Sequence, residues 1–571
     1  MYRIRVVSLF LTVLLLVACQ TTAPTERTPT ERAASAPLLD GLGTHSMPIT
    51  TDDPLTQRYF DQGLVLAYGF NHAEAARSFR AAQQLDPNCA ICYWGEALVL
   101  GPNINAPMDP ADNDAAWAAL QTARRLSSSK GRTFGETGPR GPVRMEADDR
   151  TQPDVSKKEQ ALIRALSRRY AETVPEDRSA LDRAYADAMR TVARQYPTDP
   201  DVQALFAEAL MDTTPWDYWE ADDSPKPVTE EFTAAIEAAL GQNINHPGAN
   251  HLYIHAVESV HPEKGLAAAE RLDGLVPGAG HLVHMPGHIY IRIGRYHDAV
   301  RVNRDAAAAD ERYIAQTQAQ GFYPLLYYPH NFNFLWFAAM MGGEGAVAIE
   351  TAEKIQGTLS EDMISVKRLR PTLLFAFVRF ERWNDILGLP APPNEQLYAT
   401  AMWHYGRGLA KLHTTGTNAA TDDLNTLTAI AESAAAQELE QPFFYGLSQI
   451  QIAQRLLQGE IAGAEGRHDT AIDHLRAAVE IQDALPYMEP PYWFYPVRQT
   501  LGAALLTAGR YAEAEAIYRE DLDYFAENGW SLHGLAQSLR AQGRTEEANN
   551  VQWRFERAWT HADVQLARIP N

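Results

Sequence analysis

A 34-residue periodicity near the C-terminus constrains the fold of this chain more than any other feature. A repeat of this length is typical of stacked helical hairpins, because one hairpin cannot bury its apolar face alone and packs against the next. We therefore predict an all-α fold. The pairs that match at this offset are Leu501 and Leu535, Leu505 and Leu539, Gly509 and Gly543, Arg510 and Arg544, Glu513 and Glu547, and Ala514 and Ala548.

A Gly-Arg pair with an alanine five residues after the glycine marks the corner of each predicted hairpin. The same corner occurs earlier, at Gly294 before Ala299 and at Gly466 before Ala471. The period and the corner resemble the tetratricopeptide repeat (TPR) family, in which small residues let two antiparallel helices approach at the turn. The resemblance implies a TPR-like helical-hairpin solenoid, a right-handed superhelix whose groove binds peptides or partner proteins.

Apolar spacing extends the helical prediction beyond these repeats. Segments 68–87 and 180–197 have helical periodicity, and the first closes with an Asp86-Pro87 helix stop. Segment 127–153 is rich in glycine, proline and charge without an apolar period. We predict a long inserted loop there, which is either a lid or a disordered segment.

Two further breaks in the helical pattern suggest how the chain is divided. They lie at Gly342 to Glu344 and at Gly388 to Pro393. We place a boundary near the first break. It separates an N-terminal TPR-like half that carries most of the histidines, residues 51–345, from a more regular C-terminal TPR half, residues 346–571.

The N-terminus has the pattern of a secretory signal. Arg3 and Arg5 precede an apolar run at 6–17, which is too short to span a membrane comfortably. The run leads into LVAC, ending at Cys19, which resembles the lipobox of bacterial lipoproteins. The resemblance implies a signal peptide at 1–18 and lipidation of Cys19. The alternative is a cleaved, soluble secretory protein.

Residues after the lipobox predict how the protein is attached. Gln20 stands where an aspartate retains many lipoproteins at the inner membrane, so we predict an outer-membrane lipoprotein of the bacterial envelope that faces the periplasm. Residues 19–50 are rich in Thr, Pro, Ala and Glu, and we predict a flexible tether there. The membrane contact is then the N-terminal lipid. The formal charge of -22 would repel a polyanion, so we expect no nucleic-acid partner.

Histidines gather in one part of the predicted solenoid. Eight of the seventeen lie within residues 246–297. Two pairs have the i, i+4 spacing that places both side chains on one helical face, and Glu258 continues the stripe of the first pair. The pairs are His251 with His255 and His284 with His288, and they are 33 residues apart.

A displacement close to one repeat places the two pairs on neighbouring first helices, facing the same groove. We therefore predict that their four imidazoles converge on the concave face around a zinc or copper ion. His330 is a further candidate ligand. His281 lies one turn before His284. The alternative is that these histidines are ordinary hydrogen-bonding residues of the helix pairs.

Pro286 changes which ligands are expected. If a helix starts at this proline, His288 joins the first pair and Glu258 in a better quartet. Four protein ligands make a closed, structural site, whereas three leave a position for water that zinc activates. Glu258 is the candidate general base if it is not a ligand.

Cys89 and Cys92 are the only thiols besides Cys19. They follow the helix stop at Pro87, at the expected start of the next helix. In an oxidising compartment this CxxC pair forms a disulfide, although free structural thiols, metal ligation and redox catalysis remain alternatives.

The sequence therefore carries two hypotheses of different class. The leading one is a lipid-anchored periplasmic TPR solenoid that acts as a protein-binding or scaffold module, as the resemblance to bacterial TPR lipoproteins implies. The second is a zinc or copper metalloprotein, of hydrolase or oxidase type, that uses the histidine cluster. The sequence does not decide whether the chain is an enzyme.

Overall fold

The computed structural model describes residues 36–128, 154–360 and 366–566. Every regular element in these three ranges is helical, and the β-bridges found there are isolated ones. The predicted all-α class is therefore confirmed. No helix of the described ranges has both the length and the apolar character that a membrane span requires. The predicted signal peptide and Cys19 lie outside the described residues.

In chain order the elements are α2 (Pro54–Tyr68), α3 (His72–Leu85), α4 (Ala90–Val99), η1 (Pro110–Asp112), α5 (Asn113–Ser128), α6 (Lys157–Leu166), α7 (Ser179–Gln195), α8 (Pro200–Met211), α9 (Pro227–Gln242), α10 (Pro247–Val257), α11 (Pro262–Leu272), α12 (Gly280–His284), α13 (Pro286–Arg292), α14 (Tyr296–Thr317), α15 (Phe322–Gly342), α16 (Gly345–Thr358), α17 (Val366–Leu369), α18 (Thr372–Arg379), α19 (Trp383–Gly388), α20 (Leu397–Thr414), α21 (Thr417–Ala431), α22 (Ala434–Gln437), α23 (Gly446–Ala464), α24 (His468–Asp483), α25 (Val497–Thr507), α26 (Tyr511–Tyr524), α27 (Gly529–Ala541) and α28 (Thr545–Ala558).

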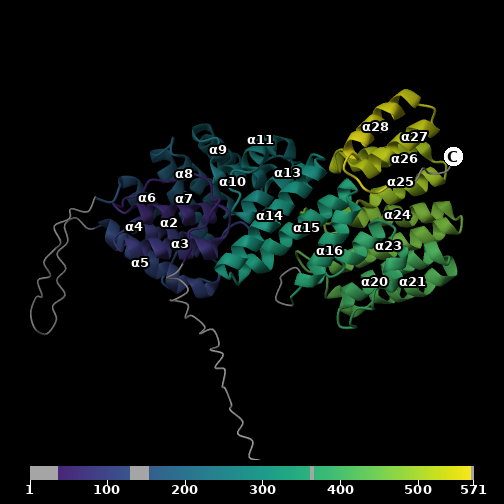
Figure 1. Cartoon of the computed structure of the whole chain (residues 1–571), viewed down its shortest axis with the longest axis horizontal. Coiled ribbons are helices and arrows are strands. Elements are labelled where there is room, and N and C mark those ends of the chain that lie inside the picture. Colours follow the sequence, from purple (N-terminus) through teal and green to yellow (C-terminus); the bar gives the residue numbers. More distant parts are fainter. Residues whose placement is uncertain (1–35, 129–153, 361–365, 567–571) are drawn as a thin grey trace, which may run out of the picture.

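The helices pack as successive hairpins along the long axis of the molecule (Figure 1). The purple and blue helices α2 to α8 form one end, the teal helices α13 to α15 form the middle, and the green and yellow helices form the other end. Helix α25 packs against α26, and α27 packs against α28. These two hairpins are the units of the 34-residue period, so the predicted helical-hairpin solenoid is confirmed.

The Gly-Arg corners have the geometry that the repeat requires. The four glycines have φ between +73° and +81°, a left-handed conformation that glycine adopts without strain. The alanine that follows each corner is buried against the partner helix. The glycines are Gly294, Gly466, Gly509 and Gly543, and the alanines are Ala299, Ala471, Ala514 and Ala548.

The segments predicted from apolar spacing are helical. Helix α3 ends at Leu85, directly before the predicted Asp86-Pro87 stop, and α7 covers most of 180–197. The predicted loop at 127–153 begins later than expected, because Ser127 and Ser128 still belong to α5. Residues 129–153 lie outside the described part of the chain.

Part of the predicted tether is instead packed against the helices. Met47 is fully buried, and the backbone N–H of Leu39 donates to Gln62 Oε1 over 2.8 Å. The N–H of Gly278 donates to Gly41 O over 2.8 Å. The tether prediction is therefore wrong for residues 36–50, because sparse apolar residues there find buried sites on the body. Residues 19–35 lie outside the described ranges.

Contacts connect the C-terminal hairpins to the middle of the molecule. Tyr296 Oη donates to Ala526 O over 3.1 Å, and Gly345 N donates to Asp563 Oδ1 over 2.7 Å. A Cβ on Gly294 would lie 2.2 Å from Ala526 O, so this corner needs glycine for close approach as well as for its φ. Hydrogen bonds thus cross the predicted division near residue 345, which stays a prediction.

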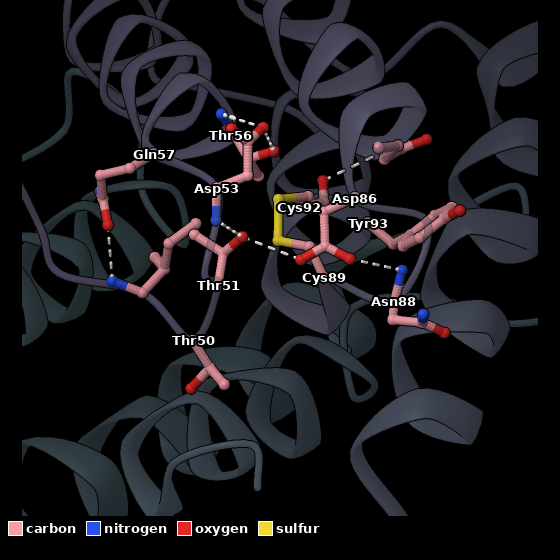
Figure 2. The surroundings of a disulfide bond; sticks show 12 residues. Thr50, Thr51, Asp53, Thr56, Gln57, Asp86, Asn88, Cys89, Cys92 and Tyr93 are labelled. Atoms are coloured by element: carbon pink, nitrogen blue, oxygen red, sulfur yellow. Dashed lines mark hydrogen bonds between the residues drawn. A yellow bond between two sulfur atoms is a disulfide. The ribbon is translucent and has the colours of Figure 1, made fainter. Parts of the chain in front are cut away.

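A disulfide joins Cys89 and Cys92 at the start of α4 (Figure 2). Both cysteines are buried. The carboxylate of Asp86 accepts hydrogen bonds from Asn88 N over 3.0 Å and from Thr51 Oγ1 over 2.9 Å. The sequence left a disulfide, free thiols, metal ligation and redox catalysis open for this pair, and the structure contains the disulfide.

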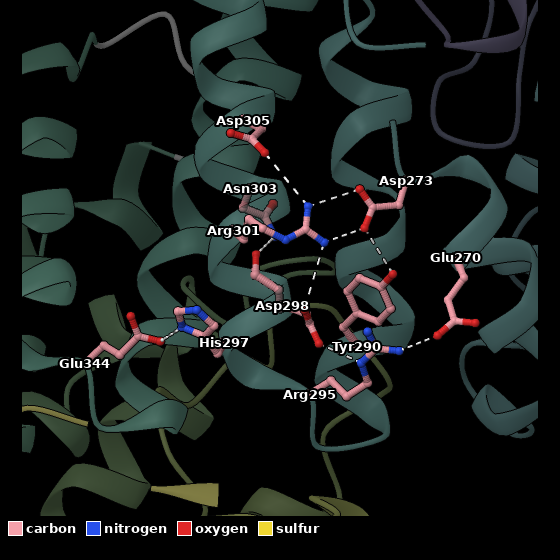
Figure 3. Close-up of polar contacts among 11 residues, drawn as sticks. Glu270, Asp273, Tyr290, Arg295, His297, Asp298, Arg301, Asn303, Asp305 and Glu344 are labelled. Atoms are coloured by element: carbon pink, nitrogen blue, oxygen red, sulfur yellow. Dashed lines mark hydrogen bonds and ion pairs between the residues drawn. The ribbon is translucent and has the colours of Figure 1, made fainter. Parts of the chain in front are cut away.

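A polar network connects α11, α13 and α14 (Figure 3). Arg301 pairs with Asp273, with Nη1 to Oδ1 at 3.1 Å, and Tyr290 Oη donates to the same carboxylate over 3.3 Å. Arg295 reaches Glu270 Oε1 over 2.7 Å. Partly exposed pairs contribute at most about 1 kcal/mol each, so this network chiefly fixes the relative position of the three helices.

Candidate metal centre

Helix α10 presents the first predicted pair. His251 and His255 lie one turn apart on it, and Glu258 follows its last residue as the C-cap. The helix starts at Pro247, and the preceding His246 caps it by accepting a hydrogen bond from Ala249 N at Nδ1 over 3.0 Å. The predicted stripe of two imidazoles and one carboxylate is therefore present on one helix end.

The second pair lies across a helix junction. Helix α12 ends at His284, and α13 starts at Pro286 as predicted for that proline. Met285 between them keeps helical backbone angles, with φ -52° and ψ -38°. His284 Nε2 and His288 Nε2 lie 2.8 Å apart, so the proline does not separate the pair.

The first pair and His281 form one compact group, which we call the first triad. One nitrogen from each of His251, His255 and His281 lies within 4.8 Å of the others. All three side chains are buried, with exposed fractions of 1%, 2% and 2%. The group therefore sits inside the protein, between α10 and α12, and does not lie open on a groove as we predicted.

Hydrogen bonds fix which nitrogens of the first triad are free. His251 Nδ1 donates to Tyr68 O over 2.6 Å, and His255 Nδ1 donates to Glu258 Oε1 over 2.8 Å. The Nε2 atom of each ring then carries a lone pair. Among the described residues neither Nε2 has a hydrogen-bond partner, and the same holds for both nitrogens of His281.

Burial keeps these imidazoles neutral. It lowers the pKa of His251 well below its usual value, and the neighbouring His255 lowers it further. Burial likewise lowers the pKa of His281 well below its usual value. Burial also lowers the pKa of His255, against the opposing charge of Glu258. Neutral imidazoles are the form that binds a metal ion.

A second group, which we call the second triad, contains His284, His288 and His330. One nitrogen from each lies within 4.8 Å of the others. His284 Nδ1 donates to Asn303 Oδ1 over 2.7 Å, so its Nε2 is the atom that faces His288. His330 comes from α15 and is partly exposed.

Glu258 lies between the two triads. Its Oε1 accepts from His255, and its Oε2 accepts from His288 Nδ1. Burial alone would raise the pKa of Glu258, but His288 and His255 lower it to about 2, so the carboxylate is charged. Both oxygens are used in orienting imidazoles, which favours an outer-sphere role over the ligand and general-base roles that the sequence predicted.

Glu489 adds a second carboxylate that the sequence reasoning missed. Its Oε2 lies 3.1 Å from His288 Nδ1, although it comes from the segment between α24 and α25. Burial lowers the pKa of His288, but Glu258 and Glu489 together raise it to about 10. No local pattern around Glu489 indicates this contact, because it depends on how the C-terminal hairpins dock.

Aromatic rings close the first triad. The Phe70 ring lies 4.5 Å from His251 and 5.6 Å from His281, measured between centroids. Phe70 has φ +55°, a left-handed conformation that is strained for a large side chain. Trp216 is 44% exposed and lies 5.1 Å from the His255 ring. Phe70 thus packs against the rings of the triad, and the exposed Trp216 packs against His255.

The structure therefore brings every predicted ligand into one region, but it divides the histidines between two triads. Each pair groups with a third histidine, so the four imidazoles of the pairs do not form one group, and the predicted binding of a single ion by both pairs stays a prediction. His281 completes the first triad. Its position one turn before His284 is the sequence feature that could have indicated it as a ligand. The predicted ligands of the region are His251, His255, Glu258, His284, His288 and His330.

Comparisons with known proteins supply no family. No family model and no curated protein matches the chain. Solved structures that share the helical arrangement include a human IFIT1 dimer with m7Gppp-AAAA, with 10% identity, 90% of this chain and 91% of that chain covered, and a TM-score of 0.29. Yeast Tom70 is 11% identical, with 88% and 90% covered and a TM-score of 0.28. The P58(IPK) TPR domain is 10% identical, with 86% and 99% covered and a TM-score of 0.20.

TM-scores of this size carry no argument about partners or activity. The class of the protein follows from its own fold and site. It is an all-α helical-hairpin repeat protein with a buried histidine cluster between two hairpins in the middle of the molecule.

Proposed function

We propose that this chain is a helical-repeat metalloprotein that binds a zinc or copper ion through the first triad. The observation that carries the proposal is the set of buried imidazole nitrogens of His251, His255 and His281 that have no partner among the described residues. An unsatisfied buried polar group destabilises a fold by about 1–3 kcal/mol, so several in one place need a compensating ligand.

The donor set selects the class of cation. Three neutral imidazole nitrogens suit zinc and copper, whereas magnesium and calcium prefer oxygen ligands. The outer partners, Tyr68 O and Glu258, hold the Nδ1–H of two rings and so orient each Nε2 toward the ion. This arrangement of imidazole and outer carboxylate is common around protein-bound zinc.

Three protein ligands leave one coordination position for water. A zinc ion there would activate the water near neutral pH, as in the hydrolase alternative. Since both oxygens of Glu258 are hydrogen-bonded, the candidate base is not free, and we propose metal binding without assigning a reaction.

Metal analysis of the protein tests this proposal. Full-length protein made without a polyhistidine tag should contain zinc or copper, and His281→Ala should lose about one equivalent. His45→Ala is the matched control, because His45 belongs to another buried histidine group. Equal metal content in wild type and His281→Ala, or none in wild type, would contradict the proposal.

Trp216 provides an independent readout. Copper(II) bound at His255, whose ring centroid lies 5.1 Å from that of Trp216, should quench the fluorescence of this indole. The quenched fraction should fall in Trp216→Phe and in His281→Ala. Quenching that is unchanged in both variants would place the copper elsewhere.

We also propose that the solenoid binds a protein or peptide partner as a lipid-anchored periplasmic scaffold. The hairpin repeat and the lipobox at Cys19 support this second candidate. So do exposed aromatic residues of the C-terminal hairpins, Tyr524 at 53% and Trp553 at 57%. Cys19→Ala should release the protein from membranes in fractionated cells, and retention would contradict the anchor. A Tyr524→Ala, Trp553→Ala variant should lose a partner that copurifies with wild type.

A further inference from the structure

We propose that the second triad binds a second zinc or copper ion, so that the histidine cluster is a dinuclear centre. The inference rests on the proposed function of the first triad and deepens it. It is carried by a correspondence between His284, His288 and His330 and the three histidines of the first triad.

The two triads have nearly the same triangle of rings. Each contains one i, i+4 pair and one histidine from another segment, and corresponding sides differ by at most about 0.4 Å. The centroid distances in the first triad are 4.8 Å for His251 to His255, 5.0 Å for His251 to His281 and 6.4 Å for His255 to His281. In the second triad they are 4.7 Å for His284 to His288, 5.0 Å for His284 to His330 and 6.0 Å for His288 to His330.

The outer hydrogen bonds correspond as well. The first histidine of each pair donates from Nδ1 to an amide oxygen, which is Tyr68 O for His251 and Asn303 Oδ1 for His284. The second histidine of each pair donates from Nδ1 to Glu258, with one oxygen for each triad. In both pairs the Nε2 atoms are thereby left to face inward.

A phenylalanine packs against each triad. Phe70 contacts the three rings of the first triad. Phe334 contacts the three rings of the second, at centroid distances of 4.5 Å from His284, 4.4 Å from His288 and 4.8 Å from His330. An apolar wall that excludes water from one side strengthens the electrostatic attraction between a cation and its ligands.

Two nitrogens of the second triad lie within hydrogen-bond distance of each other. His284 Nε2 and His288 Nε2 are 2.8 Å apart, a separation that two ligands of one cation can also have. A shared proton satisfies the contact in the metal-free protein. A divalent cation that accepts both lone pairs replaces this proton, which is released to solvent.

Two carboxylates offset the charge that a second cation adds. Glu258 serves both triads, and Glu489 lies beside His288 at 3.1 Å. The triads are adjacent, with His255 and His288 centroids 5.5 Å apart and His281 and His284 centroids 5.7 Å apart.

Zinc loading of the tag-free, full-length chain tests the second site. After desalting, wild type should retain about two zinc ions per chain, His330→Ala about one, His281→Ala about one, and the double variant none. Crystals of zinc-loaded wild type should show two anomalous peaks, one at each triad. This second measurement does not depend on how a variant folds.

The outcomes separate the two proposals. One zinc that is lost in His281→Ala and kept in His330→Ala, with a single peak at the first triad, overturns the second site and leaves the proposed function intact. Absence of metal from wild type after loading with zinc and, separately, with copper overturns both. Since Glu258 orients one histidine of each triad, Glu258→Gln should lower both zinc affinities by about 10–100-fold, whereas His330→Ala should lower only one.

Discussion

Two buried histidine groups of this molecule differ in how their hydrogen bonds are completed. One group, which we call the completed group, surrounds Asp201. Its Oδ1 is the common partner of His45 Nε2 at 2.8 Å and His246 Nε2 at 3.2 Å, and it accepts from Tyr68 Oη over 2.9 Å. In the first triad, the inward nitrogens have no partner among the described residues. A completed group of this kind stabilises the fold, whereas we propose that the incomplete one binds a metal ion.

Tyr68 contacts both groups, so the two groups are neighbours in the structure. Its hydroxyl donates to Asp201, and its backbone carbonyl accepts from His251 Nδ1. The two groups therefore share a helix end and a similar degree of burial. The remaining difference is that the first triad has imidazole nitrogens without a partner among the described residues.

The largest expected effect is the loss of Asp201. Asp201→Ala leaves His45, His246 and Tyr68 without their common acceptor, so the free energy of unfolding should fall by about 3–5 kcal/mol. Urea denaturation followed by circular dichroism measures this change. Tyr68→Phe removes one hydrogen bond alone and should lower stability by about 1 kcal/mol. Equal stability of Asp201→Ala and wild type would show that this group is not structural.

Zinc should stabilise the protein through the triads alone. A free zinc concentration about 100 times the dissociation constant adds about 2.7 kcal/mol per site. His281→Ala should lose the part of this stabilisation that comes from zinc at the first triad, while Asp201→Asn should retain all of the stabilisation by zinc. Thermal melts with and without zinc measure both. A smaller zinc increment in Asp201→Asn would mean that the cation also uses the completed group.

Acid should weaken the completed group through protonation of Asp201. Burial raises the pKa of Asp201, but hydrogen bonds from His246 and His45 lower it well below its usual value. Because the folded pKa lies below the unfolded value of about 3.9, the stabilisation is present above pH 4 and is lost as the pH falls further. Each unit of pKa difference corresponds to about 1.4 kcal/mol. In melts of metal-free protein, Asp201→Asn should lose less stability than wild type as the pH falls below 4. An equal loss in both proteins would mean that other carboxylates cause it.

The fold could be predicted largely because its signals are local. The 34-residue period, the Gly-Arg corners and the Asp86-Pro87 stop each depend on a few neighbouring residues, and the hairpins form where these signals lie. The packing of residues 36–50 could not be predicted. Gly41 in this segment accepts a hydrogen bond from the distant Gly278, whereas the low apolar content of the segment suggested a tether.

The candidate site was predictable in its members but not in its grouping. The i, i+4 spacing placed His251 with His255 correctly, since it depends on one helix alone. Spacing does not give the rotation of a short helix such as α12, so the turn of His281 toward α10 was not foreseen. Glu489 reaches the cluster only because the C-terminal hairpins fold back onto the middle of the chain.

The smallest expected effect distinguishes the two groups most sharply. His281→Leu in metal-free protein replaces an imidazole without hydrogen bonds by an apolar side chain of similar size. The free energy of unfolding should then change by less than about 1 kcal/mol or should rise, because no buried partner is left unsatisfied. Urea denaturation in the presence of a chelator measures it, with His246→Leu as the control that should lose several times more. A loss of about 3 kcal/mol in His281→Leu would show that this imidazole is a structural residue like those around Asp201, and the distinction between a completed group and a ligand site would fail.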